Sequence, residues 1–289
     1  MRQTALIYLM GAGRSGTTLI ATVLGESKNI IAIGEMHQFL EHYLDNKKCS
    51  CDKYLNNCKF WSPIIFEIEK LYTKEELLKI NNYNINIEIH SNIIKSYFKK
   101  NEIYLTFQEN LFEIINKQSK SLYYLDSAKY ISRALQLNKS KFISLKIIYV
   151  IRDVRGVINS FNKKVQTTKS PINTILYYSF INYFAQTVSW LLGKKKVLKI
   201  KYEDFVENPA KTLTEIEQFL NIDLTEIKLK IEKKEFFNIP HIIGGNRLKS
   251  HSKIILKKDL VWKQTFSRTK QLVYFILTLP IMLLNRYKA

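Results

Sequence analysis

A short segment near the start of the sequence combines glycines with hydroxyl side chains and one arginine. It follows the apolar run Ala5 to Met10 and reads Gly11-Ala12-Gly13-Arg14-Ser15-Gly16-Thr17-Thr18. Glycines let a backbone approach a ligand closely, and a helix that begins after such a turn directs its free N–H groups at an anion. The segment therefore predicts a phosphate-binding loop, whose expected contact residues are Gly13, Arg14, Ser15, Gly16, Thr17 and Thr18.

The loop departs from the Walker A pattern at one position. In that pattern four residues separate the first glycine from Gly-Lys-Ser/Thr, and Thr17 stands here in place of the lysine. Without a lysine on the outer phosphates, the hydrolysis of ATP or GTP loses a principal positive charge. Arg14 can still hold a phosphate or a sulfonate through two parallel hydrogen bonds.

A second candidate anion site follows a later apolar run. The run Leu145 to Ile151 is typical of a buried strand, and Arg152 and Asp153 come directly after it. Ser160 lies eight residues after Arg152, on a stretch that predicts a helix from Val154 to about Lys164. A guanidinium at a strand end and a hydroxyl on the next helix can converge at the carboxyl edge of a sheet.

The elements that must position these residues alternate between strands and helices. Further strands are expected at 122–125 and 197–202, and further helices at 18–24 and 210–220. This alternation predicts a single α/β domain over residues 1–289, with a central, mostly parallel sheet flanked by helices in three layers. The expected cofactor core covers about 1–35, 122–161 and 197–262, and the expected acceptor-side helical segments cover about 37–120 and 162–195.

With both anion segments identified, the sequence resembles the sulfotransferases that use 3′-phosphoadenosine 5′-phosphosulfate (PAPS), especially their tyrosylprotein and bacterial carbohydrate branches. Gly-Arg-Ser-Gly-Thr-Thr resembles the family's 5′-phosphosulfate loop, and Arg152 with Ser160 resembles its 3′-phosphate motif. The resemblance implies a P-loop-containing fold, PAPS as the sulfonate donor and adenosine 3′,5′-bisphosphate (PAP) as the product. It also implies an acceptor hydroxyl, and the bacterial branch suggests a carbohydrate or lipid-linked one.

Two later segments extend the resemblance to the cofactor site. Lys201-Tyr202-Glu203-Asp204-Phe205 is similar to a family segment whose tyrosine lies near the adenine, which assigns that role to Tyr202. Gly245, Asn246 and Arg247 are similar to a turn that closes over the 3′-phosphate in bacterial members. From the residues alone, Tyr202 is equally compatible with a core position, and the glycines with a simple turn.

The resemblance also nominates catalytic residues. Lys129, in Asp126-Ser127-Ala128-Lys129, is similar to a lysine of the bacterial members and is the expected cation for charge that develops on the bridging oxygen. Arg14, which is expected to hold the 5′-phosphosulfate, is the second catalytic cation. Glu35 aligns with the catalytic glutamate of the tyrosylprotein branch and is the preferred general base. His37 is its rival, because the cytosolic small-molecule members use a histidine.

Three cysteines lie close together in the sequence. With His37 or His42, Cys49, Cys51 and Cys58 suggest a zinc site, but their spacing differs from the usual paired Cys-x-x-Cys. Similar segments occur in bacterial sulfotransferases, so the cysteines are interpreted as a structural element of the family near the substrate entrance, and no metal is assigned to the site. PAPS-dependent transfer itself is expected to need none.

The compartment follows from cysteine usage and from the apolar runs. An odd, low cysteine count and the lack of a signal-peptide cleavage pattern predict a cytoplasmic protein. The apolar run Leu272 to Leu284 is too short to span a bilayer and contains Pro280. It predicts one packed or interfacial C-terminal helix, which leaves peripheral contact with a membrane open.

The charge balance is compatible with an anionic partner and equally with a lysine-rich solvated surface. The sequence has 45 Lys and Arg against 25 Asp and Glu, a net charge of +20. Two other functions are compatible with part of this evidence. A P-loop kinase or NTPase would use Leu122 to Asp126 as a Walker B strand, and a basic nucleic-acid-binding module would use the scattered charge. No helix-turn-helix or RNA-binding motif supports the second, and no specific nucleic acid is expected.

Overall fold

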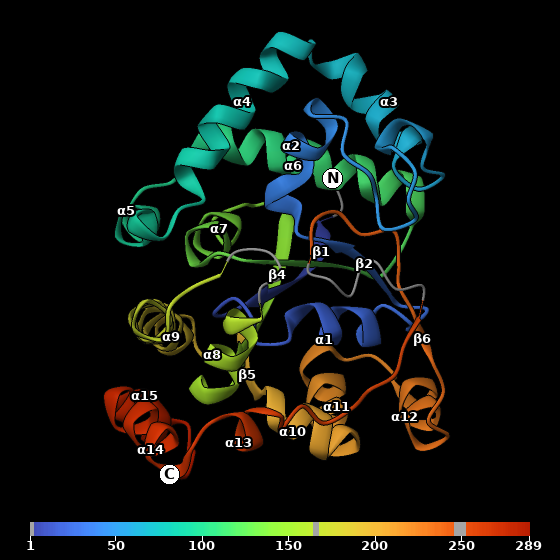
Figure 1. Ribbon diagram of the computed structural model, residues 1–289. Coiled ribbons are helices and arrows are strands. Elements are labelled where there is room, and N and C mark those ends of the chain that lie inside the picture. Colours follow the sequence, from blue (N-terminus) through green and yellow to red (C-terminus); the bar gives the residue numbers. More distant parts are fainter. Residues whose placement is uncertain (1–2, 164–167, 246–252) are drawn as a thin grey trace. The chain divides into compact units, whose positions relative to one another are not determined.

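The computed structural model describes residues 3–163, 168–245 and 253–289, shown in Figure 1. The chain divides into two compact units. The first unit comprises Met1–Met10, Thr18–Ile147 and Phe236–Ile254. The second unit comprises Gly11–Thr17, Ile148–Glu235 and Ile255–Ala289, so that one strand, β4, contributes residues to both.

Five strands form a sheet in the order β2-β3-β1-β4-β5, which confirms the predicted parallel α/β architecture. Strand β3 pairs in parallel with both β1 and β2, with Met10 opposite Lys129 and Gly34 opposite Asp126. The carboxyl ends of these three strands therefore lie at one edge of the sheet. Strands β1 and β2 are almost entirely buried and apolar, as a covered parallel sheet requires, whereas β3 carries polar residues near its end and β5 exposes Lys199. Their bounds are β1 Thr4–Met10, β2 Ile30–Gly34, β3 Tyr123–Lys129, β4 Ile143–Ile151 and β5 Val197–Lys201.

Helices cover both faces of the strands in the first unit. Helices α6 and α7 lie on one face of the sheet, and α1 lies on the other (Figure 1). A capping box formed by Thr73 and Glu76 begins α4. The short strands β6 (Phe237–Asn238) and β7 (Lys253–Ile254) pair in an antiparallel sheet. The helices are α1 Thr17–Leu24, α2 Phe39–Leu44, α3 Ser62–Leu71, α4 Lys74–Ile87, α5 Ile93–Phe98, α6 Glu102–Ser119 and α7 Ile131–Leu137.

The second unit is mostly helical around the end of β4 and β5. Asp153 caps α8 by accepting a hydrogen bond from the Arg155 backbone N–H at 2.8 Å. Pro171 and Pro209 stand in the first turns of α9 and α11, where a missing N–H costs nothing. Helix α14 packs against α8, and α15 against α9. The bounds are α8 Val154–Asn162, α9 Pro171–Leu192, α10 Tyr202–Glu207, α11 Pro209–Leu220, α12 Thr225–Glu232, α13 Trp262–Thr265, α14 Arg268–Leu277 and α15 Leu279–Leu284.

The elements differ from the sequence expectations in three places. Strand β2 was not expected, although its β-branched run Ile30-Ile31-Ala32-Ile33 carries the signal of a short buried strand. Tyr202 begins α10 instead of ending β5. The C-terminal apolar run forms two helices that meet at Thr278, because Pro280 fits the first turn of a helix but cannot continue one.

Within the described ranges, no helix has both the length and the apolar character needed to cross a bilayer.

Candidate functional site

The predicted phosphate loop runs from Gly11 to the first turn of α1. Its backbone N–H at Gly13 donates to the Tyr177 hydroxyl at 2.8 Å. Gly16 has a φ of +89°, and a Cβ on it would lie 2.2 Å from Cδ2 of Tyr202. Only glycine therefore allows the loop to pack against the Tyr202 ring in this conformation.

One hydroxyl in the loop is buried without a partner. The Ser15 side chain is fully buried, and within the described part of the chain its Oγ has no hydrogen-bond partner. A buried hydroxyl without a hydrogen bond is costly, and such groups in native proteins usually receive a ligand or water. The arrangement fits a phosphate group that would accept a hydrogen bond from Ser15. Thr17 and Thr18, which begin α1, are also buried.

Arg152 links the second anion segment to this loop. Its Nη1 donates to the Arg14 carbonyl at 3.1 Å, and its Cζ lies 4.2 Å from the centroid of the Tyr202 ring. The Arg14 Cζ lies 5.5 Å from the centroid of the Phe161 ring. The fold thus brings together Arg14, Arg152 and Tyr202, which the sequence assigned to one cofactor site. Ser160, on the last turn of α8, is half-buried.

Sequence reasoning missed an acidic partner of Arg152. The Asp259 Oδ2 accepts a hydrogen bond from the Arg152 Nη2 at 2.9 Å. Burial alone would raise the pKa of Asp259, but the Arg152 guanidinium outweighs this effect and holds the pKa below its ordinary value. Asp259 follows two lysines in a stretch with no recognisable motif, so no local signal identified it.

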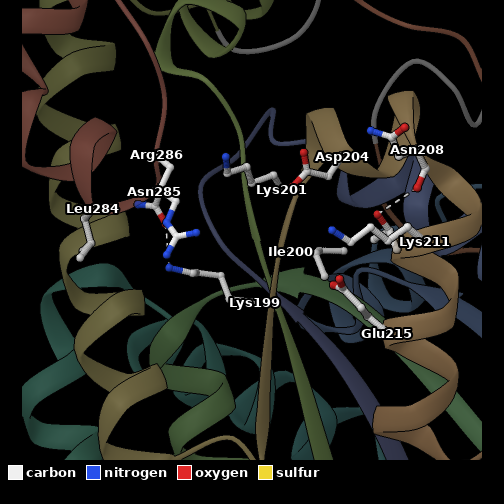
Figure 2. A pocket seen from close by; sticks show the side chains of 11 residues that line it. Lys199, Ile200, Lys201, Asp204, Asn208, Lys211, Glu215, Leu284, Asn285 and Arg286 are labelled. Atoms are coloured by element: carbon white, nitrogen blue, oxygen red, sulfur yellow. Dashed lines mark hydrogen bonds between the residues drawn. The ribbon is translucent and has the colours of Figure 1, made fainter.

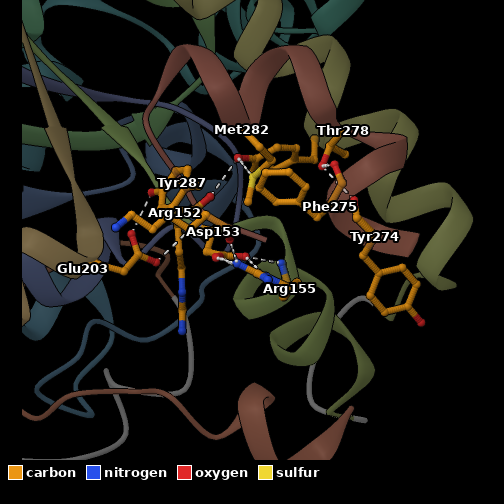
Figure 3. A network of polar contacts seen from close by, with 11 residues as sticks. Arg152, Asp153, Arg155, Glu203, Tyr274, Phe275, Thr278, Met282 and Tyr287 are labelled. Atoms are coloured by element: carbon orange, nitrogen blue, oxygen red, sulfur yellow. Dashed lines mark hydrogen bonds and ion pairs between the residues drawn. The ribbon is translucent and has the colours of Figure 1, made fainter. Parts of the chain in front are cut away.

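A polar network in the second unit fixes the backbone that carries Arg152 (Figure 3). The Tyr178 hydroxyl donates to the Arg152 carbonyl at 2.9 Å. Glu203 accepts from the Asp153 N–H at 3.0 Å and from the Tyr287 hydroxyl at 2.7 Å. The C-terminal segment therefore helps to set the position of the strand-end arginine.

Glu35 and Lys129, the predicted base and cation, form an ion pair in the first unit. Glu35 follows β2, Lys129 ends β3, and the Lys129 Nζ donates to the Glu35 Oε1. Lys129 has a φ of +75°, and its Nζ also donates to the Ser127 carbonyl at 3.3 Å. Both side chains are largely buried, with 19% of Lys129 and 10% of Glu35 exposed. A buried charge pair at the carboxyl ends of adjacent strands is a suitable place for proton transfer.

The side chain of Gln38 connects His37 to this ion pair. The Gln38 Nε2 is 3.4 Å from the Glu35 Oε2 and 3.2 Å from the His37 Nε2. Burial, and then the positive charges of Lys129 and Arg133, lower the pKa of His37 well below its ordinary value. Among the described residues its buried Nδ1 has no partner. His37 is therefore a neutral imidazole close to the predicted base.

The turn near the C-terminus is described only in part. Gly245 has a φ of +87°, which suits glycine, and Gly244 donates its backbone N–H to the His42 Nε2 at 3.3 Å. Asn246 and Arg247, which were predicted to bind the cofactor, lie outside the described residues.

The carboxylate that a kinase would need for magnesium is already neutralised. Asp126 is fully buried and accepts hydrogen bonds from the Arg133 Nε at 2.9 Å and the Met36 N–H at 3.2 Å. An open magnesium site would leave such a carboxylate accessible to the ion and its waters. The geometry therefore argues against a Walker B role for Asp126.

A pocket of about 410 Å³ in the second unit lies apart from the predicted donor residues (Figure 2). It is formed by β5, α10, α11 and the residues after α15. The Lys199 Nζ at its wall donates to Asn285 at 2.9 Å and to Gln186 at 3.0 Å. Of the predicted cofactor residues that the structure describes, none lines this pocket. Its charged lining residues are Lys199, Lys201, Asp204, Lys211, Glu215 and Arg286.

Comparison with known protein families agrees with the assignment of the phosphate loop and of Arg152 beside it. A model of the sulfotransferase family matches residues 7–226, which is well over half of the chain. The chain belongs to the sulfotransferase family and is a sulfotransferase. This confirms the family inferred from the Gly-Arg-Ser-Gly-Thr-Thr segment.

Solved structures with similar folds are also sulfotransferases. The sulfotransferase domain of the Synechococcus PCC 7002 olefin synthase is 18% identical, with a TM-score of 0.55 over 100% of this chain and 96% of that one. The sulfotransferase domain from the curacin biosynthetic pathway is 16% identical, with a TM-score of 0.53 over 100% and 99%. At these identities the likeness concerns the fold. A comparison with curated protein sequences gives no match.

Proposed function

We propose that this sulfotransferase moves a sulfonate group from PAPS to an acceptor hydroxyl. The observation that carries the proposal is the joint placement of the loop, with its unpartnered Ser15 hydroxyl, and the Arg152 guanidinium in one unit. The loop and Arg14 would hold the 5′-phosphosulfate, and Arg152 with Ser160 the 3′-phosphate. The Tyr202 ring would lie near the adenine, and Gly245, Asn246 and Arg247 would close over the 3′-phosphate.

In the transfer step, the acceptor oxygen attacks the sulfur, and the bond from sulfur to the bridging phosphate oxygen breaks. PAP leaves with the electron pair of that bond, and Glu35 takes the acceptor proton. Lys129, already beside Glu35, would supply positive charge to the bridging oxygen as its bond to sulfur breaks. These groups, together with Arg14, provide the charge that the step needs, so we propose that no metal takes part in it.

We propose that the two units together form a single sulfotransferase domain. The family match from 7 to 226 includes residues of both units, and β4 contributes to both. The helical segments 37–120 and 162–195 are the proposed source of the acceptor-side residues. Within the family resemblance, a carbohydrate or lipid-linked hydroxyl is the first class of acceptor to screen with labelled PAPS.

Nucleotide binding tests the proposed donor. Calorimetry of the full chain should show binding of PAP without magnesium and no magnesium-dependent binding of ATP. Arg152→Met should weaken PAP binding by at least tenfold, because it removes a charge-assisted contact to phosphate. Lys211→Met, a basic residue on the pocket of Figure 2, is the matched control and should bind PAP normally. Binding of magnesium–ATP in preference to PAP would overturn the proposal in favour of a kinase.

We propose a reducing, cytoplasmic location with peripheral contact at an anionic membrane surface. The support is that none of the three cysteines, all of which lie in the described ranges, forms a disulfide, and that α14 and α15 expose Leu272, Ile276, Leu277 and Leu283 beside basic residues. The full chain should sediment with vesicles containing phosphatidylserine but not with pure phosphatidylcholine. Ile276→Asp should reduce that sedimentation, and an unchanged result would count against membrane contact.

A further inference from the structure

Three cysteines and one histidine converge in the first unit. Cys49, Cys51 and Cys58 come from one loop, and His241 comes from a segment 183 residues after Cys58. Their ligand atoms all lie within 4.8 Å of one another. The sequence suggested His37 or His42 as the histidine partner of these thiols, and the structure places His241 there instead.

Three of the separations are close to those between ligands of one tetrahedral ion. The His241 Nδ1 is 3.3 Å from the Cys58 Sγ and 3.9 Å from the Cys49 Sγ, and the two sulfurs of Cys51 and Cys58 are 3.6 Å apart. Zinc binds sulfur at about 2.3 Å and imidazole nitrogen at about 2.0 Å. A tetrahedron with those bond lengths has edges of roughly 3.5–3.8 Å. A disulfide would instead bring two sulfurs to about 2.05 Å and leave the third thiol alone.

The backbone around these side chains is held by its own hydrogen bonds. The Cys49 N–H donates to the Lys53 carbonyl at 2.9 Å, and the Asp52 N–H donates to the Cys49 carbonyl at 3.0 Å. Trp61 donates its Nε1–H to the His241 carbonyl at 2.9 Å. The ligand-bearing segments are therefore positioned by contacts that do not depend on the thiols.

Two of the four ligands are buried, and Cys51 and His241 are partly exposed. Cys49 is 4% exposed and Cys58 is fully buried. The ring of Phe60 stacks on that of His241, with their centroids 6.2 Å apart and their planes at 10°. Aromatic packing that fixes an imidazole and excludes water is a common feature of the shell around a metal site.

We propose that Cys49, Cys51, Cys58 and His241 form a structural zinc site of the Cys₃His type. Thiolates are soft ligands that favour zinc over magnesium or calcium, and four protein ligands complete its tetrahedral shell. Because the shell is complete, the ion has no open position for a substrate or water. Zinc therefore has a structural role here and takes no part in sulfonate transfer.

The site joins the cysteine loop to a segment that contacts the proposed base. Next to His241, Ile243 donates its N–H to the Ile33 carbonyl at 3.2 Å and accepts from the Glu35 N–H at 2.7 Å. Zinc would thus fix the segment that pairs with the end of β2 and positions the Glu35 backbone. This last consequence rests on the proposed function, whereas the site itself does not.

Metal analysis of the full chain tests the site directly. Protein purified without added metal should contain one zinc per chain, and the zinc released by a thiol-blocking reagent should match that content. Substitution by cobalt should give the visible absorption bands of a tetrahedral thiolate site. Removal of zinc by a strong chelator should lower the unfolding temperature by roughly 10 °C, since structural zinc contributes folding free energy.

Two variants separate ligation from general destabilisation. His241→Ala should lose the zinc, whereas His42→Gln, which changes a nearby histidine outside the cluster, should keep it. Zinc below about a tenth of an equivalent with reduced thiols, or a Cys51–Cys58 disulfide in native protein, would overturn the proposal. PAP binding is a separate readout: zinc without PAP binding would refute the proposed function alone, and PAP binding without zinc would refute the metal site alone.

Discussion

At the scale of single residues, three of the proposed functional charges, on Glu35, Lys129 and Arg152, are held in ion pairs. Lys129 pairs with Glu35, and Arg152 pairs with Asp259. Side chains in these pairs are well buried, except for Asp259, which is 31% exposed. A buried charge is stable only with a partner, so each proposed ligand-binding charge must exchange its protein partner for a ligand group.

Replacing Glu35 by glutamine tests the proposed base. The amide keeps the shape of the side chain but cannot take a proton, so Glu35→Gln should lower kcat by about 10²- to 10³-fold. The KM for PAPS should change little, and steady-state kinetics measure both constants. Glu41→Gln changes a carboxylate that is also paired with a lysine, Lys47, but is more exposed, and should retain activity. Near-full activity in Glu35→Gln, with a loss in His37→Gln, would transfer the role to His37.

Removing the charge of Asp259 should favour donor binding. In Asp259→Asn, the Arg152 guanidinium no longer has to break an ion pair with a carboxylate before it binds the 3′-phosphate. PAP should therefore bind roughly threefold to tenfold more tightly, a modest effect because the pair is partly exposed. Calorimetry with PAP measures the change, and Asp45→Asn, an exposed carboxylate paired with Lys47, is the control. Weaker binding would show that Asp259 positions Arg152 for the phosphate.

At the scale of elements, the site depends on turns that only glycine can make. Gly16 lets the phosphate loop pass the ring of Tyr202 at the start of α10. Gly34, with a φ of +87°, ends β2 where a Cβ would lie 2.2 Å from the Ile243 carbonyl oxygen. The glycines therefore determine where α1 begins and where Glu35 leaves the sheet.

Alanine substitutions at two glycines distinguish the effect of backbone strain from that of a steric clash between the added Cβ and a neighbouring side chain. Gly16→Ala should introduce both, whereas Gly193→Ala introduces only strain, since its φ is +74° and no atom lies within 4 Å of its added Cβ. Gly193→Ala should cost about 1 kcal/mol of stability and leave PAP binding unchanged. Gly16→Ala should also weaken PAP binding by more than tenfold. Equal PAP affinities in calorimetry would contradict the packing of the loop on Tyr202.

At the scale of the whole molecule, distant segments determine the position of the functional groups. The C-terminal residues after α15 reach the backbone at the end of β4, as Figure 3 shows. Burial raises the pKa of Glu203, although the Tyr287 hydroxyl and the Asp153 N–H both favour its charged form. Loss of one of these donors would leave the buried Glu203 carboxylate with fewer hydrogen bonds, which lowers the stability of the folded state.

Tyr287→Phe tests this long-range support. Removal of the hydroxyl should lower the free energy of unfolding by about 1–2 kcal/mol, measured by denaturant titration. PAP affinity should also fall slightly, because Glu203 holds the Asp153 N–H beside Arg152. Tyr274→Phe is the control, since the Tyr274 hydroxyl points away from the network (Figure 3). Equal stability of the two variants would show that the Tyr287 hydrogen bond contributes nothing.

The sequence by itself determined the family, the parallel α/β architecture and the loop from Gly11 to Thr18. These follow from short patterns, because an apolar strand, a glycine turn and a helix start are specified by residues close together in the chain. Strand β2 carried such a signal in only five residues and was missed. Placement of Arg152 at a strand end was predictable for the same local reason.

Only the tertiary structure decided which side chains meet. Glu35 and Lys129 are 94 residues apart, Arg152 and Asp259 are 107 apart, and the cysteines gather around His241 instead of a nearby histidine. No spacing rule links such residues, because their contact depends on strand order and on the path of the connecting segments. The sequence therefore identified the chemical types of the proposed functional residues, whereas only the tertiary structure shows which residues they contact.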